Sequence, residues 1–136
     1  MKRVLRIMID IFQPEGIDWM NFALSKNNPY TFHHIVEKSK GGDKSIDNGA
    51  ILTRKAHTFL HMLEKSCPDA YQNLQNVFVK INETKRPVTE DIINEIDDIL
   101  YDIFVAQKYD IDESVDLTPF YANYYKGKKR IKKCLK

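Results

Sequence analysis

This 136-residue chain contains few cysteines, glycines and prolines, the residues that cross-link a small fold or break its helices and strands. Its two cysteines, Cys67 and Cys134, stand far apart and belong to no C-x-x-C pair, so neither a cysteine zinc knuckle nor a disulfide framework is expected. Glycine and proline contribute five residues each, which excludes a long low-complexity stretch. Since 43% of the residues are hydrophobic, the chain can bury the core of one domain.

Long hydrophobic runs are also missing. Residues 1–12 begin with basic residues and turn apolar, but Arg6 and Asp10 interrupt the run and no small-residue cleavage site follows. We therefore expect no signal peptide and no membrane-spanning segment. The cytoplasm is the default location for a chain with this cysteine usage.

Charge is nearly balanced, with a net charge of +2, but it is unevenly distributed. Residues 88–117 contain ten acidic residues and one basic residue, Lys108. The last eleven residues, 126–136, contain seven Lys or Arg. A basic tail is typical of polyanion contact and equally typical of a solvated terminus, so both interpretations stay open.

Hydrophobic spacing predicts a mainly helical α+β fold. Helices are expected over 2–12, around Trp19 to Ala23, over 54–65 with Thr53 as its cap, around 71–81, and over 88–108. Short strands are expected at 30–32 and 50–53, separated by a polar loop at 37–47. We assign residues 1–125 to a single domain, with a motif core at about 30–65, helical additions at 1–26 and 69–109, and a basic tail at 126–136.

Histidine is absent outside one window of 29 residues, His33 to His61. His33 and His34 are adjacent, so on a strand their side chains point to opposite faces. His57 and His61 are four residues apart, which places both rings on one face of a helix. The pattern indicates a clamp of three imidazole ligands and one free imidazole. Phosphodiester hydrolysis needs these parts: a base that activates water, and a cation that neutralises the phosphate and the departing oxygen.

The segment HHIVEKSKGGDKSIDNGAILTRKAHTFLH resembles the HNH endonuclease family, whose site is a ββα-metal motif. The likeness consists of the His dyad, the asparagine Asn48, the closing His57, the Gly-Gly loop and the apolar pair Ile51-Leu52. His61 adds an H-x-x-x-H ending similar to that of colicin-type DNase toxins. The resemblance covers residues 30–65, about a quarter of the chain, and implies a short β-hairpin plus helix surrounded by further helices. The cysteine pairs that often brace this fold are absent, so the surrounding helices must brace it.

The resemblance implies a role for each residue of the motif. His34 would be the general base, and His33, His57 and His61 would hold one divalent metal ion. Asn48 would hold the loop so that the base stays oriented. The product would carry a 5′ phosphate and a 3′ hydroxyl.

The identity of the metal stays open. Three imidazoles favour zinc, nickel, cobalt or manganese over magnesium, which prefers oxygen ligands. Many relatives of the family, however, carry an acid at the position of His33 and use magnesium. Basic side chains around the clamp could neutralise flanking phosphates or simply be surface charges that keep the protein soluble: Lys38, Lys40, Lys44, Arg54 and Lys55.

The function expected from these observations is metal-dependent cleavage of DNA, in a housekeeping, phage or toxin setting. DNA is the expected partner and a membrane is not. A homodimer, and an inhibitor or immunity partner if the chain is a toxin, remain open. Two alternatives of another class also remain: a metal-stabilised nucleic-acid-binding module that does not cleave, and an interaction domain that uses the acidic helix.

Overall fold

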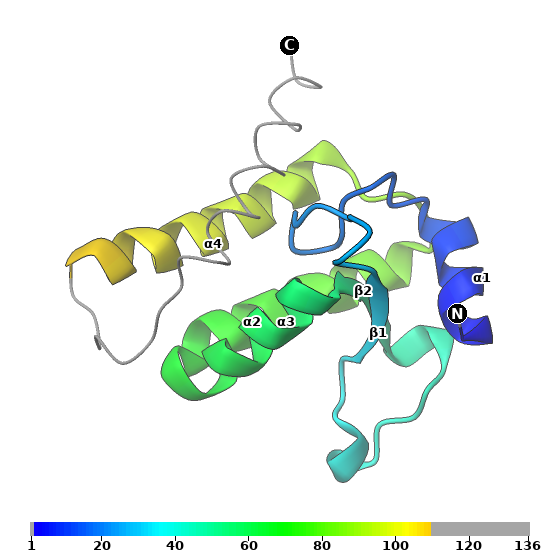
Figure 1. Cartoon of the computed structure of the whole chain (residues 1–136). Coiled ribbons are helices and arrows are strands. Elements are labelled where there is room, and N and C mark those ends of the chain that lie inside the picture. The colour runs from blue at the N-terminus through cyan, green and yellow to red at the C-terminus, as the bar shows by residue number, and fades with distance from the viewer. Residues whose placement is uncertain (1, 110–136) are drawn as a thin grey trace.

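The computed structural model describes residues 2–109, with the backbone alone described from residue 104 onward. It is an α+β fold and mainly helical, as the sequence predicts (Figure 1). The elements in chain order are α1 (Arg3–Phe12), β1 (Tyr30–His34), β2 (Gly49–Thr53), α2 (Arg54–Ser66), α3 (Pro68–Thr84) and α4 (Glu90–Tyr109). Two short 3₁₀ turns follow β1: η1 (Lys38–Lys40) lies within the predicted loop 37–47, and η2 (Ile46–Asn48) lies at its end.

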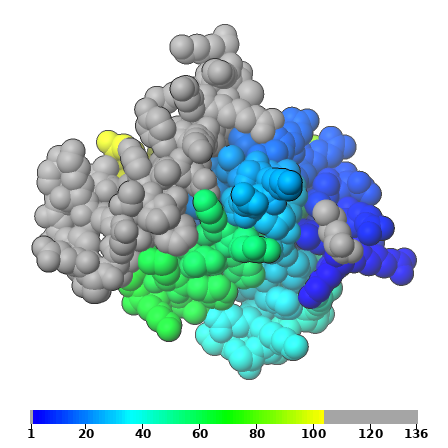
Figure 2. All heavy atoms as spheres, in the orientation of Figure 1, coloured from blue at the N-terminus to red at the C-terminus, as the bar shows by residue number. Residues whose placement is uncertain are grey.

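The two strands form an antiparallel hairpin. Tyr30 pairs with Thr53 at one end, and His34 pairs with Gly49 at the other. The connecting residues form a long loop that projects from the rest of the chain (Figure 1). Figure 2 shows this loop in cyan at the lower edge of the molecule. α2 follows β2 directly, and α2 and α3 lie side by side while α4 packs on α3 (Figure 1).

Local chemistry explains where α2 begins and ends. The Thr53 side chain accepts a hydrogen bond from the backbone N–H of Ala56, which satisfies one of the unpaired donors of the first turn. Pro68 cannot continue a preceding helix but suits the first turn of a new one, and it begins α3. The predicted cap and the predicted break are therefore both confirmed. α3 extends to Thr84, further than the spacing indicated.

The predicted helix around Trp19 to Ala23 is wrong. This segment is irregular, with a single bridge between Ile17 and Ala23. The Asp18 carboxylate accepts hydrogen bonds from the backbone N–H groups of Met20 at 2.8 Å and Phe22 at 2.9 Å, and these bonds compete with a helical turn. Trp19 and Phe22 are nevertheless buried, so their apolar character reflects the core and not a helix face.

α3 braces the hairpin with two buried amide side chains two turns apart. Gln75 donates to the carbonyl of Ile35 at 2.6 Å. Asn82 donates to the carbonyls of Ile46 at 2.6 Å and Gly49 at 2.8 Å. Both ends of the loop are therefore held by the same helix.

None of the helices in the described range combines the length and the apolar character that a bilayer crossing requires. The predicted basic tail at 126–136 and the acidic residues beyond 109 lie outside the described residues. The side chain of Phe104, the last member of the predicted apolar stripe of α4, is also outside the described side chains.

Candidate functional site

Three of the four histidine rings gather between β1 and α2. The ring centre of His33 lies 5.2 Å from that of His57 and 6.4 Å from that of His61. The rings of His57 and His61 are stacked, with their centres 4.9 Å apart, and His33 stands nearly perpendicular to both. Three imidazoles bound tetrahedrally to a zinc-like ion, with N–metal distances of about 2 Å, would have ring centres about 5 Å apart.

The ring nitrogens do not yet share a centre. Across the residues that the structure describes, no set of three or more His, Cys, Asp or Glu side chains is placed to hold a metal ion as the rings stand. Ring nitrogens of His33 and His57 instead contact the neighbouring side chains of Gln75 and Thr31. The three rings are thus assembled by the backbone, while one nitrogen on each of two rings is already engaged.

His33 is the innermost of the three, and only 3% of it is exposed. Its Nε2 lies 2.8 Å from the side-chain oxygen of Gln75, and its Nδ1 is buried with no hydrogen-bond partner among the described atoms. The pKa of His33 is lowered from 6.5 to about 4, chiefly by burial; the bond to Gln75 opposes this shift, and the neighbouring His57 and His61 add to it. His33 is therefore neutral at neutral pH.

His57 is half-buried and His61 is exposed, so the cluster runs from the core to the surface. The Nδ1 of His57 lies 3.2 Å from the hydroxyl of Thr31 on β1. Burial, and then the neighbouring His61, lower the pKa of His57, which also favours its neutral form. The arrangement offers neutral nitrogen donors that a solute can approach from the side of His61.

His34 faces the opposite side of β1, as strand alternation requires. Its ring packs edge-on against Phe32, with ring centres 4.9 Å apart. Partial burial, followed by the charges of Lys44 and Lys38, lowers the pKa of His34. At neutral pH this imidazole can therefore accept a proton, and it lies in positively charged surroundings.

Asn48 closes the loop that follows His34. Its side-chain oxygen accepts from the N–H of Val36 at 2.8 Å, and its amide donates to the carbonyls of Val36 at 3.0 Å and Asp43 at 2.8 Å. Gly42 packs against this contact so closely that a Cβ there would overlap the Val36 carbonyl. The Asn48 side chain therefore holds the loop closed, and the Asn48-Gly49 pair is not the two-residue turn of a tight hairpin.

The five predicted basic residues do not lie together. Lys38 and Lys44 act on the pKa of His34, which places them near its ring. Arg54 and Lys55 begin α2, at the end of the hairpin away from His34. Lys40 belongs to the loop turn η1, and all five side chains are exposed.

Three side chains near the histidines were missed by the sequence reasoning: Gln75, Thr31 and Lys2. Lys2 precedes α1 and also lowers the pKa of His34. Gln75 lies on the same helix face as Tyr71, Phe78 and Asn82, so a polar residue within a buried stripe was the available signal. Thr31 gave no signal, because a threonine in a strand is ordinary.

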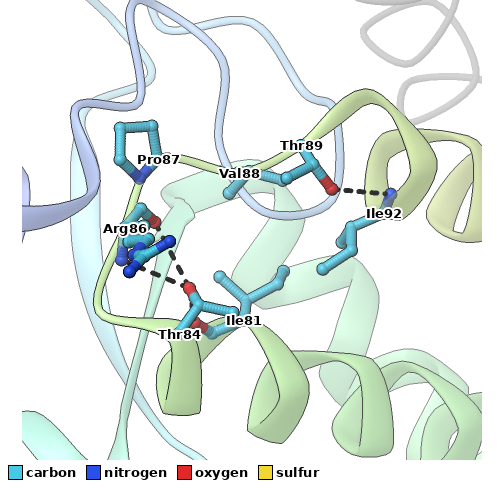
Figure 3. Close-up of a pocket in the computed structure, with 7 residues that line it drawn as sticks. All are labelled: Ile81, Thr84, Arg86, Pro87, Val88, Thr89 and Ile92. Carbon is cyan, nitrogen blue, oxygen red and sulfur yellow. Dashed lines mark hydrogen bonds between the residues drawn. The ribbon is translucent and has the colours of Figure 1, made fainter.

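Two cavities are lined by described residues. A cavity of about 550 Å³ lies between the end of α3 and the start of α4, where Thr84 bonds the backbone of Arg86 and the hydroxyl of Thr89 bonds the N–H of Ile92 (Figure 3). Among the seven lining residues that the structure describes, Arg86 alone is charged. A second cavity, of about 310 Å³, lies against α3 and includes Gln75.

Comparisons with protein-family models, with curated proteins and with solved structures returned no match for this chain.

Proposed function

We propose that this chain is a metal-dependent HNH endonuclease that hydrolyses phosphodiester bonds in DNA, with β1, β2 and α2 as its ββα core. The observation that carries the proposal is the division of the four histidines. The rings of His33, His57 and His61 lie close together, and burial favours the neutral form of the first two, whereas His34 lies on the opposite face of β1 among lysines. The resemblance of residues 30–65 to the HNH motif agrees with that division.

His33, His57 and His61 would hold one divalent ion. Loading would require the rings to turn about their side-chain bonds so that one nitrogen of each reaches a common point, while the far nitrogens of His33 and His57 keep their contacts with Gln75 and Thr31. When bound, the ion supplies charge neutralisation at the scissile phosphate and at the departing 3′ oxygen. Imidazole donors favour zinc, nickel, cobalt or manganese over magnesium.

His34 would act as the general base. Its unprotonated ring nitrogen takes a proton from the attacking water, whose oxygen bonds to phosphorus while the bond to the 3′ oxygen breaks. The nearby Lys38 and Lys44 neutralise the phosphates that flank the cut and keep the pKa of His34 low. Asn48 fastens the loop that carries these lysines, which supports its proposed positioning role.

The test is plasmid cleavage by the purified full chain with a panel of divalent metals, and with a chelator as the blank. His34→Ala should abolish turnover and keep bound metal, whereas His57→Ala should lose both. Thr58→Ala, which alters an exposed residue between the two helical ligands, is the matched control and should behave as the unaltered chain. Full cleavage by His34→Ala would refute the assignment of the base.

Other results would favour the alternatives. DNA retention without cleavage, with stability that falls on chelation, would indicate a metal-stabilised binding module. A chain that binds no nucleic acid would favour an interaction domain that uses the acidic face of α4. A cytoplasmic location, a homodimer and an inhibitor or immunity partner remain parts of the proposal that need their own measurements.

A further inference from the structure

We propose that Gln75 and Thr31 are positioning residues that select which ring nitrogen each of two histidines presents to the ion: Nδ1 of His33 and Nε2 of His57. This inference rests on the metal site proposed above. It concerns the protein's own hydrogen-bond network, which fixes the position of each proton before any ion arrives.

The orientation of the Gln75 amide is determined by its other contacts. A backbone carbonyl can only accept, so the atom 2.6 Å from the carbonyl of Ile35 must be the amide nitrogen of Gln75. The amide oxygen therefore faces His33, 2.8 Å from Nε2. An amide oxygen has no proton to give, so the proton of that bond belongs to Nε2 of His33.

A neutral imidazole carries one N–H, so Nδ1 of His33 is left with a lone pair. That atom is buried and has no hydrogen-bond partner among the described residues. Buried polar atoms without a partner are rare and costly, and an ion that occupies the site would satisfy this one. Phe78 stands edge-on to the ring, with ring centres 5.9 Å apart, and helps to hold its plane.

Thr31 fixes the proton of His57 in the opposite sense. The hydroxyl of Thr31 has one proton, and it donates that proton to the carbonyl of Leu52 at 2.8 Å. Toward Nδ1 of His57, at 3.2 Å, the same oxygen can then only accept. His57 consequently holds its proton on Nδ1 and leaves Nε2 unprotonated.

The two partners play the part that outer residues play around known metal sites. A hydrogen bond to the far nitrogen fixes the tautomer and the orientation of the ring, and loss of such a partner weakens metal binding by roughly 10- to 100-fold. A residue with a merely structural role would lower stability without changing where the histidine protons lie.

The experiment reads the protons directly. Long-range ¹H–¹⁵N spectra of the metal-free full chain, labelled at histidine, should show His33 protonated at Nε2 and His57 protonated at Nδ1. Gln75→Leu should release His33 into a mixture of tautomers, and Thr31→Val should do the same to His57. Thr31→Ser keeps a hydroxyl and should retain the original tautomer.

Cobalt(II) titration then measures the consequence. Affinity should fall roughly 10- to 100-fold in Gln75→Leu and in Thr31→Val and should be nearly unchanged in Thr31→Ser. Asn82→Leu is the matched control, because it removes the other α3 amide that grips the hairpin but leaves both histidine partners in place. If Gln75→Leu does not fold, Thr31→Val still tests the idea at His57.

Three results would overturn the inference. His33 protonated at Nδ1 in a chain that takes up cobalt, or tautomers that do not respond to Gln75→Leu and Thr31→Val, would overturn it alone. Correct tautomers in a chain that takes up no cobalt would overturn the proposed metal site and the ligating role together.

Discussion

His33 and His34 are neighbours in the sequence, yet the two faces of β1 give them different chemistry. The inner face buries His33 among other rings and anchors it to an amide on α3. The outer face leaves His34 half-exposed beside lysines, with one aromatic neighbour. The comparison shows how one short strand can give two neighbouring imidazoles distinct surroundings: a buried, hydrogen-bonded and neutral ring on one side, and a ring beside lysines that is partly open to solvent on the other.

The largest expected effect is on activity, from a substitution on the outer face of β1. His34→Gln should lower the single-turnover rate of DNA cleavage roughly 100- to 10,000-fold, the range by which general bases contribute. The melting temperature should hardly change, because His34 has no hydrogen bond in the described structure that the variant would break. If His34→Gln lowered the melting temperature strongly as well as the cleavage rate, His34 would be a structural residue like His33, and the proposed difference between the two faces would be wrong.

A second prediction uses the pH dependence of stability. The unfolded chain binds a proton at His33 near pH 6.5, but the folded chain does so only near pH 4. Between these values the unfolded state holds more protons, so the free energy of unfolding of the metal-free protein falls as the pH drops from about 6.5 to 4. The difference over that window is roughly 3 kcal/mol.

His33→Gln should remove this loss of stability, and urea unfolding at several pH values would measure it. The comparison must be made between the two chains. Burial raises the pKa of Asp18 to about 6, so that carboxyl titrates in the same window with the opposite sign. Because Asp18 is unchanged in the variant, its contribution cancels. Parallel stability curves for the two chains would contradict the prediction.

A third, smaller effect concerns the loop after β1. Asn48→Ala removes three hydrogen bonds, two that join the ends of the loop at Val36 and one to Asp43 within it, and should cost about 1–2 kcal/mol. Hydrogen exchange at the Val36 amide should quicken more than exchange in α2. Ser45→Ala, which removes only the local bond to Asp43, serves as the control on the same loop. Equal exchange in both variants would mean that Asn48 does not fasten the loop.

The smallest effect probes the lysines. Lys44 lowers the pKa of His34, so Lys44→Gln should raise that pKa and shift the acid limb of the pH–rate profile to higher pH. Lys55→Gln, at the other end of the hairpin, should leave the limb in place. Identical shifts from the two variants would show that the lysines act through general charge and not through proximity to His34.

Much of the fold follows from local signals in the sequence. The bounds of α2 could be predicted because Thr53 and Pro68 act on their immediate neighbours. Segment 17–28 could not, since its shape depends on the Asp18 side chain, which also reaches across to the N–H of Thr53 at 2.7 Å. Asn21 there adopts a positive φ of 63° and bonds the backbone of Ile93 on α4, a partner that spacing cannot reveal.

The candidate site shows the same limit. Strand alternation and helical spacing placed the four histidines on their elements and faces, because both are local rules. The partner of His33 lies 42 residues away, and no periodicity links a histidine to a distant glutamine. Side-chain partners brought in from another helix are a product of packing, so the structure was needed to find them.

The grip of α3 on the hairpin has a consequence for how the protein tolerates its surroundings. Carboxamides neither ionise nor oxidise under physiological conditions, so the fastenings at Ile35, Ile46 and Gly49 keep their strength in acid, in reductant and in chelator. For the proposed metal site, these fastenings imply that folding does not depend on loading with an ion. We expect the chain to stay folded when it is stripped of metal, unlike a zinc finger, which unfolds when its metal leaves.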